Sequence, residues 1–156
     1  VLNVPQDLSL RRRNYSPVGT KSIDVDLRTR TRREEFLLGL KEFGCVEHAS
    51  EWLEERMRGP VFMAKAMYFG SAYVGSMLVT GTQAEAVLEM ICVEQKWRGR
   101  GVASALVDEA LVQLSKQQVP HIVARAVRRN ASAMKFFKRS GFDWVRTEEY
   151  LLGRDM

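Results

Sequence analysis

The stretch that decides the fold reads Val93-Glu94-Gln95-Lys96-Trp97-Arg98-Gly99-Arg100-Gly101-Val102-Ala103. It joins an apolar run typical of a strand to the start of a long amphipathic helix. The first turn of a helix leaves about four N–H groups without intrahelical partners, and the backbone dipole places roughly half a positive charge there. Gly99 and Gly101 remove side chains that would keep an anion away, and Arg98 and Arg100 add positive charge. This arrangement predicts a turn that binds a pyrophosphate.

Two other phosphate-binding motifs do not fit this stretch. A P-loop requires the string G-x-x-x-x-G-K-[ST], which the sequence lacks. A dinucleotide-binding turn requires G-x-G-x-x-G, but Ser104 occupies the position of the third glycine. That fold also needs an acidic residue about 20 residues further on, and the chain has no acid between Glu109 and Asp143. We therefore exclude both motifs.

On either side of this turn, the spacing of hydrophobic residues predicts a single α+β domain. The chain has 156 residues, of which 46% are hydrophobic and 28% charged, as is typical of one globular domain. No apolar run approaches the roughly 20 residues of a membrane-spanning helix, so we expect no membrane contact. The start of the chain lacks the layout of a secretion signal. Residues 1–21 read as an extended arm or loosely docked segment, and residues 22–156 as the domain.

The expected elements follow from residue spacing. Ile23, Val25 and Leu27 alternate with charged residues and predict the first strand. We expect helices over 32–43, 46–58, 102–117 and 131–139, strands over 61–68, 72–79, 86–93 and 122–127, and one or two closing strands within 142–152. Short connections containing glycine separate the three middle strands and favour an antiparallel meander. The order is β-α-α-β-β-β-α-β-α-β-β, a mixed and mostly antiparallel central sheet flanked by helices.

The distribution of charge and the two cysteines limit which ligands, metal sites and cellular locations we expect. The net charge is +5, and the acid-free interval holds basic residues throughout: Lys116, Arg125, Arg128, Arg129, Lys135, Lys138 and Arg139. Such a stretch suits a phosphorylated cofactor or a nucleic acid, and a solvated basic surface would explain it equally. Cys45 and Cys92 form no CxxC motif and no ligand spacing with His48 or His121. We therefore expect no metal site, no disulfide scaffold and a cytoplasmic protein.

Two strings resemble the signatures of the GNAT superfamily of N-acetyltransferases. Arg98-Gly99-Arg100-Gly101-Val102-Ala103 is similar to that family's acyl-CoA loop, [RQ]-x-x-G-x-[GA]. The segment from Asn130 to Phe142 resembles its second signature, N-x-x-A-x-x-[LF]-[YF]-x-x-x-G-F. The likeness is close over residues 86–142, extends over 22–85 only in the order of elements, and does not cover 1–21.

The resemblance implies a GNAT-like fold that binds acetyl-CoA or another short acyl-CoA. Ile91, Cys92 and Val93 would pair through their backbones with the pantetheine amides, as an added strand does. The pyrophosphate would be held by backbone N–H groups of Arg98, Gly99, Arg100, Gly101, Val102, Ala103 and Ser104. Asn130 would face the pantetheine arm, and Phe136 and Phe137 would pack along it. The adenosine 3′-phosphate would meet one of Lys135, Lys138 or Arg139.

Candidate catalytic residues follow from the same comparison. Glu89 is our candidate general base, since we place it on the face of its strand that Ile91 and Val93 share, among apolar neighbours that could raise its pKa. Phe137 stands where the family often has a Tyr that acts as general acid, and phenylalanine has no proton to donate. Tyr150 is our first choice of acid because the closing strands border the acceptor site in this family. Other donors considered are Tyr68, Tyr73 and Ser132.

The resemblance implies an enzyme that transfers an acetyl group to a primary amine of a small molecule, peptide or protein by direct attack in a ternary complex. A homodimer is compatible with it. Glu47, Glu51, Glu54 and Glu55 could attract a cationic amine or simply form a solvated helix face. Two alternatives remain open: a non-catalytic acyl-CoA sensor, suggested by Phe137, and a basic nucleic-acid-binding module. The basic residues do not alternate with aromatic ones as a base-stacking surface requires, so we regard nucleic acid as an unlikely partner.

Overall fold

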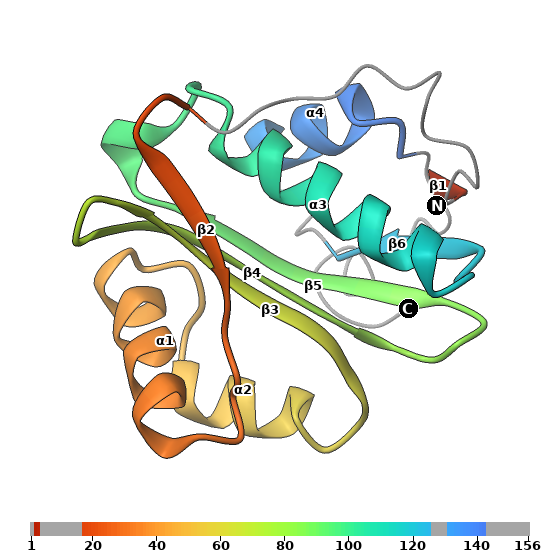
Figure 1. Cartoon of the computed structure of the whole chain (residues 1–156), viewed down its shortest axis with the longest axis horizontal. Coiled ribbons are helices and arrows are strands. Elements are labelled where there is room, and N and C mark those ends of the chain that lie inside the picture. The colour runs from red at the N-terminus through yellow and green to blue at the C-terminus, as the bar shows by residue number, and fades with distance from the viewer. Residues whose placement is uncertain (1, 4–16, 126–130, 143–156) are drawn as a thin grey trace.

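The computed structural model describes residues 2–3, 17–125 and 131–142, and Figure 1 shows the arrangement of their helices and strands. The helices are α1 (Arg30–Glu42), α2 (Ala49–Arg56), α3 (Val102–Lys116) and α4 (Ala131–Arg139), with a short 3-10 helix η2 (Gln95–Trp97). The strands are β1 (Leu2–Asn3), β2 (Thr20–Asp24), β3 (Val61–Phe69), β4 (Ala72–Gly81), β5 (Ala86–Val93) and β6 (His121–Ala124). The expected order of elements is confirmed across these residues, and the closing strands within 142–152 fall almost wholly outside them.

The strands form one six-stranded sheet in the order β1-β6-β5-β4-β3-β2. All neighbouring pairs are antiparallel except β5 and β6, which run parallel because helix α3 returns the chain between them. The mixed, mostly antiparallel α+β sheet predicted from the sequence is therefore confirmed. The middle strands β3, β4 and β5 form the antiparallel meander that the short connections favoured.

Helices cover both faces of the sheet and divide the core in two. Helices α1 and α2 lie on one face, and α3 and α4 lie on the other (Figure 1). We call the two halves the α3-side core and the α1/α2-side core. The α3-side core includes Met77, Leu88, Val93, Leu106 and Leu111. The α1/α2-side core includes Phe36, Leu40, Leu53, Met90 and Cys92. Burial of these apolar side chains supplies the main driving force that fixes the two helical layers on the sheet.

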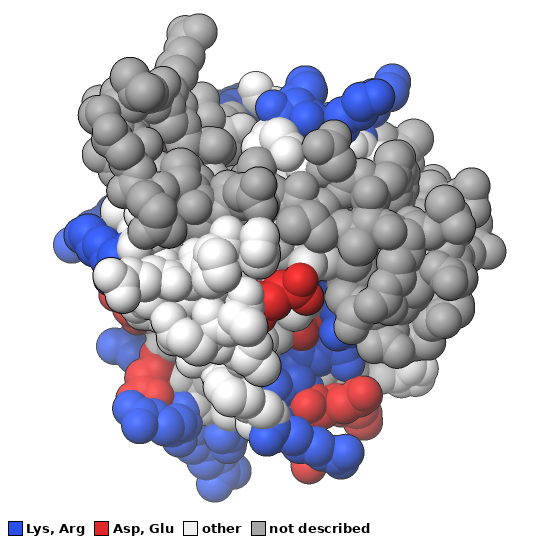
Figure 2. Space-filling view, turned by 90° about the vertical axis from the view of Figure 1, so that its right-hand side faces the viewer, with Lys and Arg blue, Asp and Glu red and all other residues white. Residues whose placement is uncertain are grey.

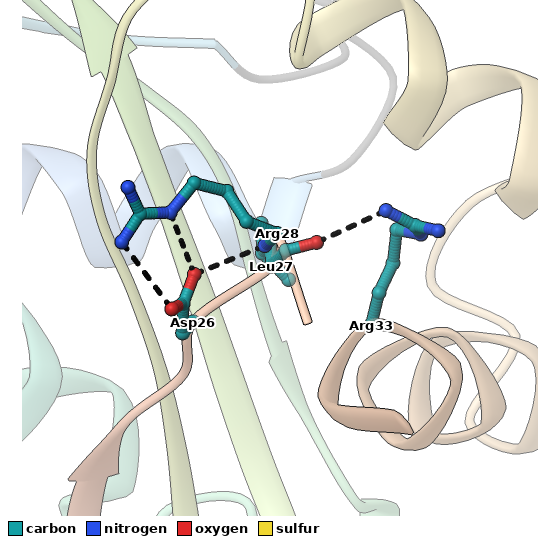
Figure 3. Close-up of polar contacts among 4 residues, drawn as sticks. All are labelled: Asp26, Leu27, Arg28 and Arg33. Carbon is teal, nitrogen blue, oxygen red and sulfur yellow. Dashed lines mark hydrogen bonds and ion pairs between the residues drawn. The ribbon is translucent and has the colours of Figure 1, made fainter. Parts of the chain in front are cut away.

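Strand β2 ends before Val25 and Leu27, which the alternation had included, and a polar turn follows it. Strand β2 stops at Asp24, and Asp26 accepts hydrogen bonds at Oδ1 from the backbone N–H and the Nε of Arg28, both at 3.0 Å (Figure 3). Hydrogen bonds from Arg28 lower the pKa of the Asp26 carboxyl. Arg33 in the first turn of α1 donates from Nη1 to the Leu27 carbonyl at 3.2 Å. These contacts turn the chain from the sheet into α1, while Leu27 is buried in the α1/α2-side core.

The amino-terminal arm contributes to the sheet where it is described. Leu2 and Asn3 pair antiparallel with Ile122 and His121, so β1 is the edge strand beyond β6. Strand β2 begins at Thr20, two residues before the start that we expected for the domain at residue 22. Helix α2 begins at Ala49 rather than near Val46, because His48 takes a left-handed conformation with φ of 51° and interrupts the helical path.

A disulfide joins Cys45 to Cys92, which corrects the expectation that both thiols stand alone. The two Cα atoms lie 5.7 Å apart although 47 positions separate them in sequence. Cys45 lies in the connection between α1 and α2, and Cys92 lies on β5 with its side chain in the α1/α2-side core. Sequence spacing could not reveal the pairing because it arises when α1 packs on the sheet and brings the following loop over β5.

Among the described residues, no helix has the length and apolar character needed to cross a membrane.

Candidate active site

The turn that opens α3 has the geometry that its glycines suggested. Gly99 and Gly101 have φ of 76° and 91°, in the left-handed region that favours glycine, and Gly101 caps the helix. A Cβ placed on either glycine would meet nothing within 4 Å, so the space beside the turn is open. The outer side of this turn is therefore accessible to a ligand that approaches the backbone.

The start of α3 is electropositive and offers free donors. Gly101 makes no side-chain cap, the first turn holds no acidic residue, and the first N–H that bonds back to the Gly101 carbonyl is that of Ala105, at 3.0 Å. Helix geometry therefore leaves the N–H groups of Val102, Ala103 and Ser104 without intrahelical partners. Together with the partial positive charge of the helix dipole, these donors could bind an anion such as a pyrophosphate.

The two arginines of the turn have different contacts. Arg98 donates from Nε to the Val93 carbonyl at 3.2 Å, which ties the turn to the end of β5. Arg100 lies with its guanidinium carbon 5.2 Å from the centre of the Trp97 ring, and that ring packs at 5.2 Å against Phe69. Trp97 therefore packs beneath the turn, which accounts for it without a purine partner.

Strands β5 and β6 separate next to this turn. Their parallel pairing runs from Ala86 with Ile122 to Leu88 with Ala124, and the N–H of Arg125 bonds to the Leu88 carbonyl at 3.0 Å. Beyond that point, residues 90–93 have no partner strand on the β6 side within the described part of the chain, while β4 pairs with their other side. This edge includes Ile91, Cys92 and Val93. Backbone groups alternate in direction along a strand, and Glu94 bonds toward β4, so Ile91 and the N–H of Val93 point to the open side, while the Val93 carbonyl accepts from Arg98.

Helix α4 packs beside the α3-side core. Phe136 and Phe137 both pack against that core, and Phe137 also contacts Phe142 with ring centres 5.3 Å apart. Lys135, Lys138 and Arg139 of the same helix are exposed. Asn130, the proposed pantetheine contact, lies outside the described residues.

The charges differ between the two ends of the face in Figure 2. Lys and Arg atoms without acidic neighbours stand at its top, at the height of α4 in Figure 1, and both signs mix at its bottom, at the height of α1 and α2. Within α4 itself, Lys135, Lys138 and Arg139 are exposed and no acidic residue lies among them, which suits an anion. The four glutamates 47, 51, 54 and 55 are all exposed, as on a solvated helix face, and Glu55 pairs with Arg56 at 3.5 Å.

Glu89 lies on the opposite face of the sheet from the one that we predicted. The register of β4 with β5 shifts from Leu78 opposite Met90 to Val79 opposite Leu88, so Glu89 is the extra residue of a β-bulge. The bulge breaks the alternation, and Glu89 therefore does not share the face of Ile91 and Val93. Its carboxylate instead points toward α2, whose Leu53 packs with Met90 in the α1/α2-side core.

Charged and polar partners surround the Glu89 carboxylate instead of the apolar neighbours that we expected. Its Oε2 accepts a hydrogen bond from the Thr80 hydroxyl at 2.6 Å. Its Oε1 lies 3.2 Å from Nε of Arg125 and 3.5 Å from Nε of Arg56. The Glu89 side chain is only 6% exposed. Sequence reasoning missed Thr80, Arg56 and Arg125, because they come from three different elements and no local motif links them.

The candidate proton donors occupy different environments. Burial raises the pKa of Tyr73, and the nearby Ser76 hydroxyl opposes that effect. The Tyr73 ring packs at a tilt against Phe43 and edge-to-face against Tyr68. Burial also raises the pKa of Tyr68, which is half-buried. Ser132 is exposed on α4. Tyr150, our first choice, lies outside the described residues.

No group of three or more His, Cys, Asp or Glu side chains that could hold a metal ion is found within the described residues.

We compared the sequence with models of known protein families and with curated protein sequences. A family model described as an acetyltransferase (GNAT) domain matches residues 28–152. A search of curated protein sequences found no match.

Several solved structures share the fold at low sequence identity. AAC(6')-Iy, solved with the bisubstrate analogue CoA-S-monomethyl-acetylneamine, superposes with a TM-score of 0.67 at 15% identity, covering 83% of this chain and 94% of that one. Naa50 of Arabidopsis thaliana, solved with the bisubstrate analogue CoA-Ac-MVNAL, gives 0.67 at 18% identity, covering 83% and 86%. The ribosomal-protein-alanine N-acetyltransferase of Brucella melitensis biovar Abortus 2308 gives 0.66 at 16% identity, covering 83% and 95%. At these identities the structural likeness supports the fold, and the domain match supports the family. Because that match spans most of the chain and both signature strings lie in the expected elements, this protein belongs to the GNAT acetyltransferase family.

Proposed function

We propose that this protein transfers an acetyl group from acetyl-CoA to a primary amine by direct attack. The observation that carries the proposal is the open left-handed turn at Gly99 and Gly101, placed beside the edge of β5 that β6 leaves unpaired. A diphosphate can reach the N–H groups that begin α3, and an extended arm with amide groups can pair along residues 91–93. The two features adjoin, as one elongated ligand requires.

Further residues would complete acetyl-CoA binding. The exposed cations of α4, Lys135, Lys138 and Arg139, suit the 3′-phosphate because no acid lies among them on that helix. Phe136 and Phe137 present apolar surface beside the α3-side core, and Asn130 immediately precedes α4. Glu89 lies four positions before Val93, about 13 Å along the strand at about 3.3 Å per residue, and we place the acyl group near it.

Glu89 would serve as the base. An ammonium group cannot attack a thioester, so the amine must lose a proton before or while its bond to the acyl carbon forms. Formation of that bond makes the nitrogen more acidic, and a carboxylate held nearby, directly or through water, can then accept its proton. Glu89→Gln is therefore expected to lower turnover at least about tenfold with affinity for acetyl-CoA unchanged. The departing thiolate must also be protonated or stabilised, and Tyr150 is the donor that we propose.

The chemical class of the amine that accepts the acetyl group is the least specified part of this proposed function. The structural relatives were solved with an aminoglycoside-derived and a peptide-derived analogue, and a third is named for a ribosomal protein. We propose an amine of one of these kinds, on a small molecule or at a peptide or protein terminus. We propose a cytoplasmic location on the supply of acetyl-CoA alone, because the Cys45–Cys92 disulfide removes the argument from unpaired thiols.

The test follows free thiol released from acetyl-CoA across an amine panel: glycinamide, spermidine, an aminoglycoside and short peptides with free amino termini. Release that depends on the amine supports the proposal. Thermal stabilisation by acetyl-CoA without release by any amine would instead indicate an acyl-CoA sensor, the alternative that Phe137 suggests because it has no proton to donate.

A further inference from the structure

A buried polar cluster centred on Glu89 links three elements at the point where β5 and β6 separate. Thr80 comes from β4, Arg56 from the last residue of α2, and Arg125 from the first position after β6. The side chains of Glu89, Arg56 and Arg125 are 6%, 13% and 16% exposed. Placing charges in such a buried position costs free energy, which the ion pairs of Glu89 with both arginines and of Arg56 with Glu55 offset in part.

The two carboxylate oxygens of Glu89 have different surroundings. Oε2 is fixed by the short 2.6 Å hydrogen bond from the Thr80 hydroxyl. Oε1 is buried and has no hydrogen-bond partner, although two guanidinium groups lie within 3.5 Å of it. One oxygen is therefore fixed by a hydroxyl, and the other lies in ion pairs with two guanidinium groups. The carboxylate as a whole lies beside the point where β6 leaves β5, because Arg125 is the first residue after β6.

We propose that Thr80 is a positioning residue for acyl transfer, holding the Glu89 carboxylate in the orientation in which it accepts the proton of the incoming amine, directly or through water. The inference rests on the proposed function of Glu89 and adds to it the group that sets its orientation. The terminal torsion of a glutamate is broad, so the orientation of the carboxylate depends on its partners. The two arginines pair with Oε1, and among the described residues the Thr80 hydroxyl is the group that fixes Oε2.

The direct test compares Thr80→Val with Thr80→Ser. Valine keeps the branched shape and removes the hydroxyl, whereas serine keeps the hydroxyl. We expect Thr80→Val to lower kcat about tenfold with the KM for acetyl-CoA unchanged, since misplacing a catalytic group by about 1 Å can cost up to about 100-fold. Thr80→Ser should restore most of the turnover. Thr80→Ala provides the same test if the valine variant does not fold.

Ser76→Ala is the matched control. Ser76 lies on the same strand and, by alternation, on the same face as Thr80, and its hydroxyl is also buried. It has no contact with Glu89 in the described structure, so its loss should change stability and leave kcat as in the wild-type protein. An equal fall of kcat in Ser76→Ala and Thr80→Val would show a structural effect and overturn the proposal, as would wild-type turnover in Thr80→Val.

The double variant Thr80→Val with Glu89→Gln separates the two hypotheses. If Thr80 acts through Glu89, the double variant should have the turnover of Glu89→Gln alone, because the two changes remove one function. Independent, multiplicative losses overturn the positioning role and leave the base role intact. Wild-type turnover in Glu89→Gln overturns the proposed function of Glu89 itself, and the positioning role with it.

Discussion

At the scale of single residues, one inserted position changes the chemistry of the site. Glu89 would face the α3-side core if β5 alternated regularly, but the bulge turns it toward α2 and places it between Arg56 and Arg125. The sequence pointed to Glu89 as the candidate carboxylate, and its role as a base stays a prediction. Its face and its partners depend on strand register, which a bulge alters without any clear signal in composition.

Tyr73 provides a pH-dependent prediction at this scale. Burial raises the pKa of Tyr73 above the ordinary value of about 10. The stabilisation is complete below that ordinary value, and it is lost as pH rises, because the unfolded chain releases the phenolic proton before the folded protein does. We expect the urea midpoint to fall between about pH 9 and pH 11.

Tyr73→Phe should weaken this alkaline loss, since it removes the titrating hydroxyl. Tyr68→Phe is the matched comparison, because Tyr68 contacts the same ring edge-on but is half-buried. Urea titrations of the three proteins at each pH measure the effect. The same alkaline loss in Tyr73→Phe as in the wild-type protein would show that another group is responsible.

At the scale of elements, the start of α3 carries the binding prediction. Gly101→Val should weaken acetyl-CoA binding, because valine is strained at a φ of 91° and its side chain fills the open space beside the turn. Gly44→Val is the control, since Gly44 also has a positive φ and open surroundings but lies between α1 and α2. Calorimetric titration with acetyl-CoA should show a loss of at least about tenfold for Gly101→Val alone. Equal affinities in both variants would contradict the assignment of this turn.

The disulfide ties another pair of elements together, the α1–α2 connection and β5. For the 47-residue separation, loop-closure entropy gives a stabilisation of about 4 kcal/mol. Reduction with dithiothreitol should therefore lower the free energy of unfolding by an amount of this order, measured by urea denaturation. The double variant with Cys45→Ala and Cys92→Ala should not respond to the reductant. Identical denaturation of the wild-type protein with and without reductant would show that the disulfide is absent in solution.

At the scale of the whole molecule, the two proposed substrates would approach from opposite faces of the sheet. The start of α3 and the cations of α4 lie on one face, while the Glu89 carboxylate points to the face covered by α1 and α2. Acetyl-CoA would approach from the first side and the amine from the second, meeting where β5 and β6 diverge. This arrangement favours a complex in which both substrates are bound together.

A kinetic prediction follows from the same arrangement. Both cysteines of the chain are joined in the disulfide, so neither thiol is available to carry the acyl group. Initial rates measured over a grid of acetyl-CoA and amine concentrations should therefore give intersecting double-reciprocal lines, as direct transfer requires. Parallel lines would indicate a covalent acyl-enzyme and would contradict direct attack.

The order of elements, the α+β class and the turn at Gly99 and Gly101 were predictable from the sequence, because periodicity and turn chemistry are local properties. The family was predictable as well, because two short signature strings carry it. Only the tertiary structure decided the face of Glu89, its contacts with Thr80, Arg56 and Arg125, and the bond between Cys45 and Cys92. These depend on how strands align and where α1 and α2 pack, and residues distant in sequence meet only when the whole sheet is assembled.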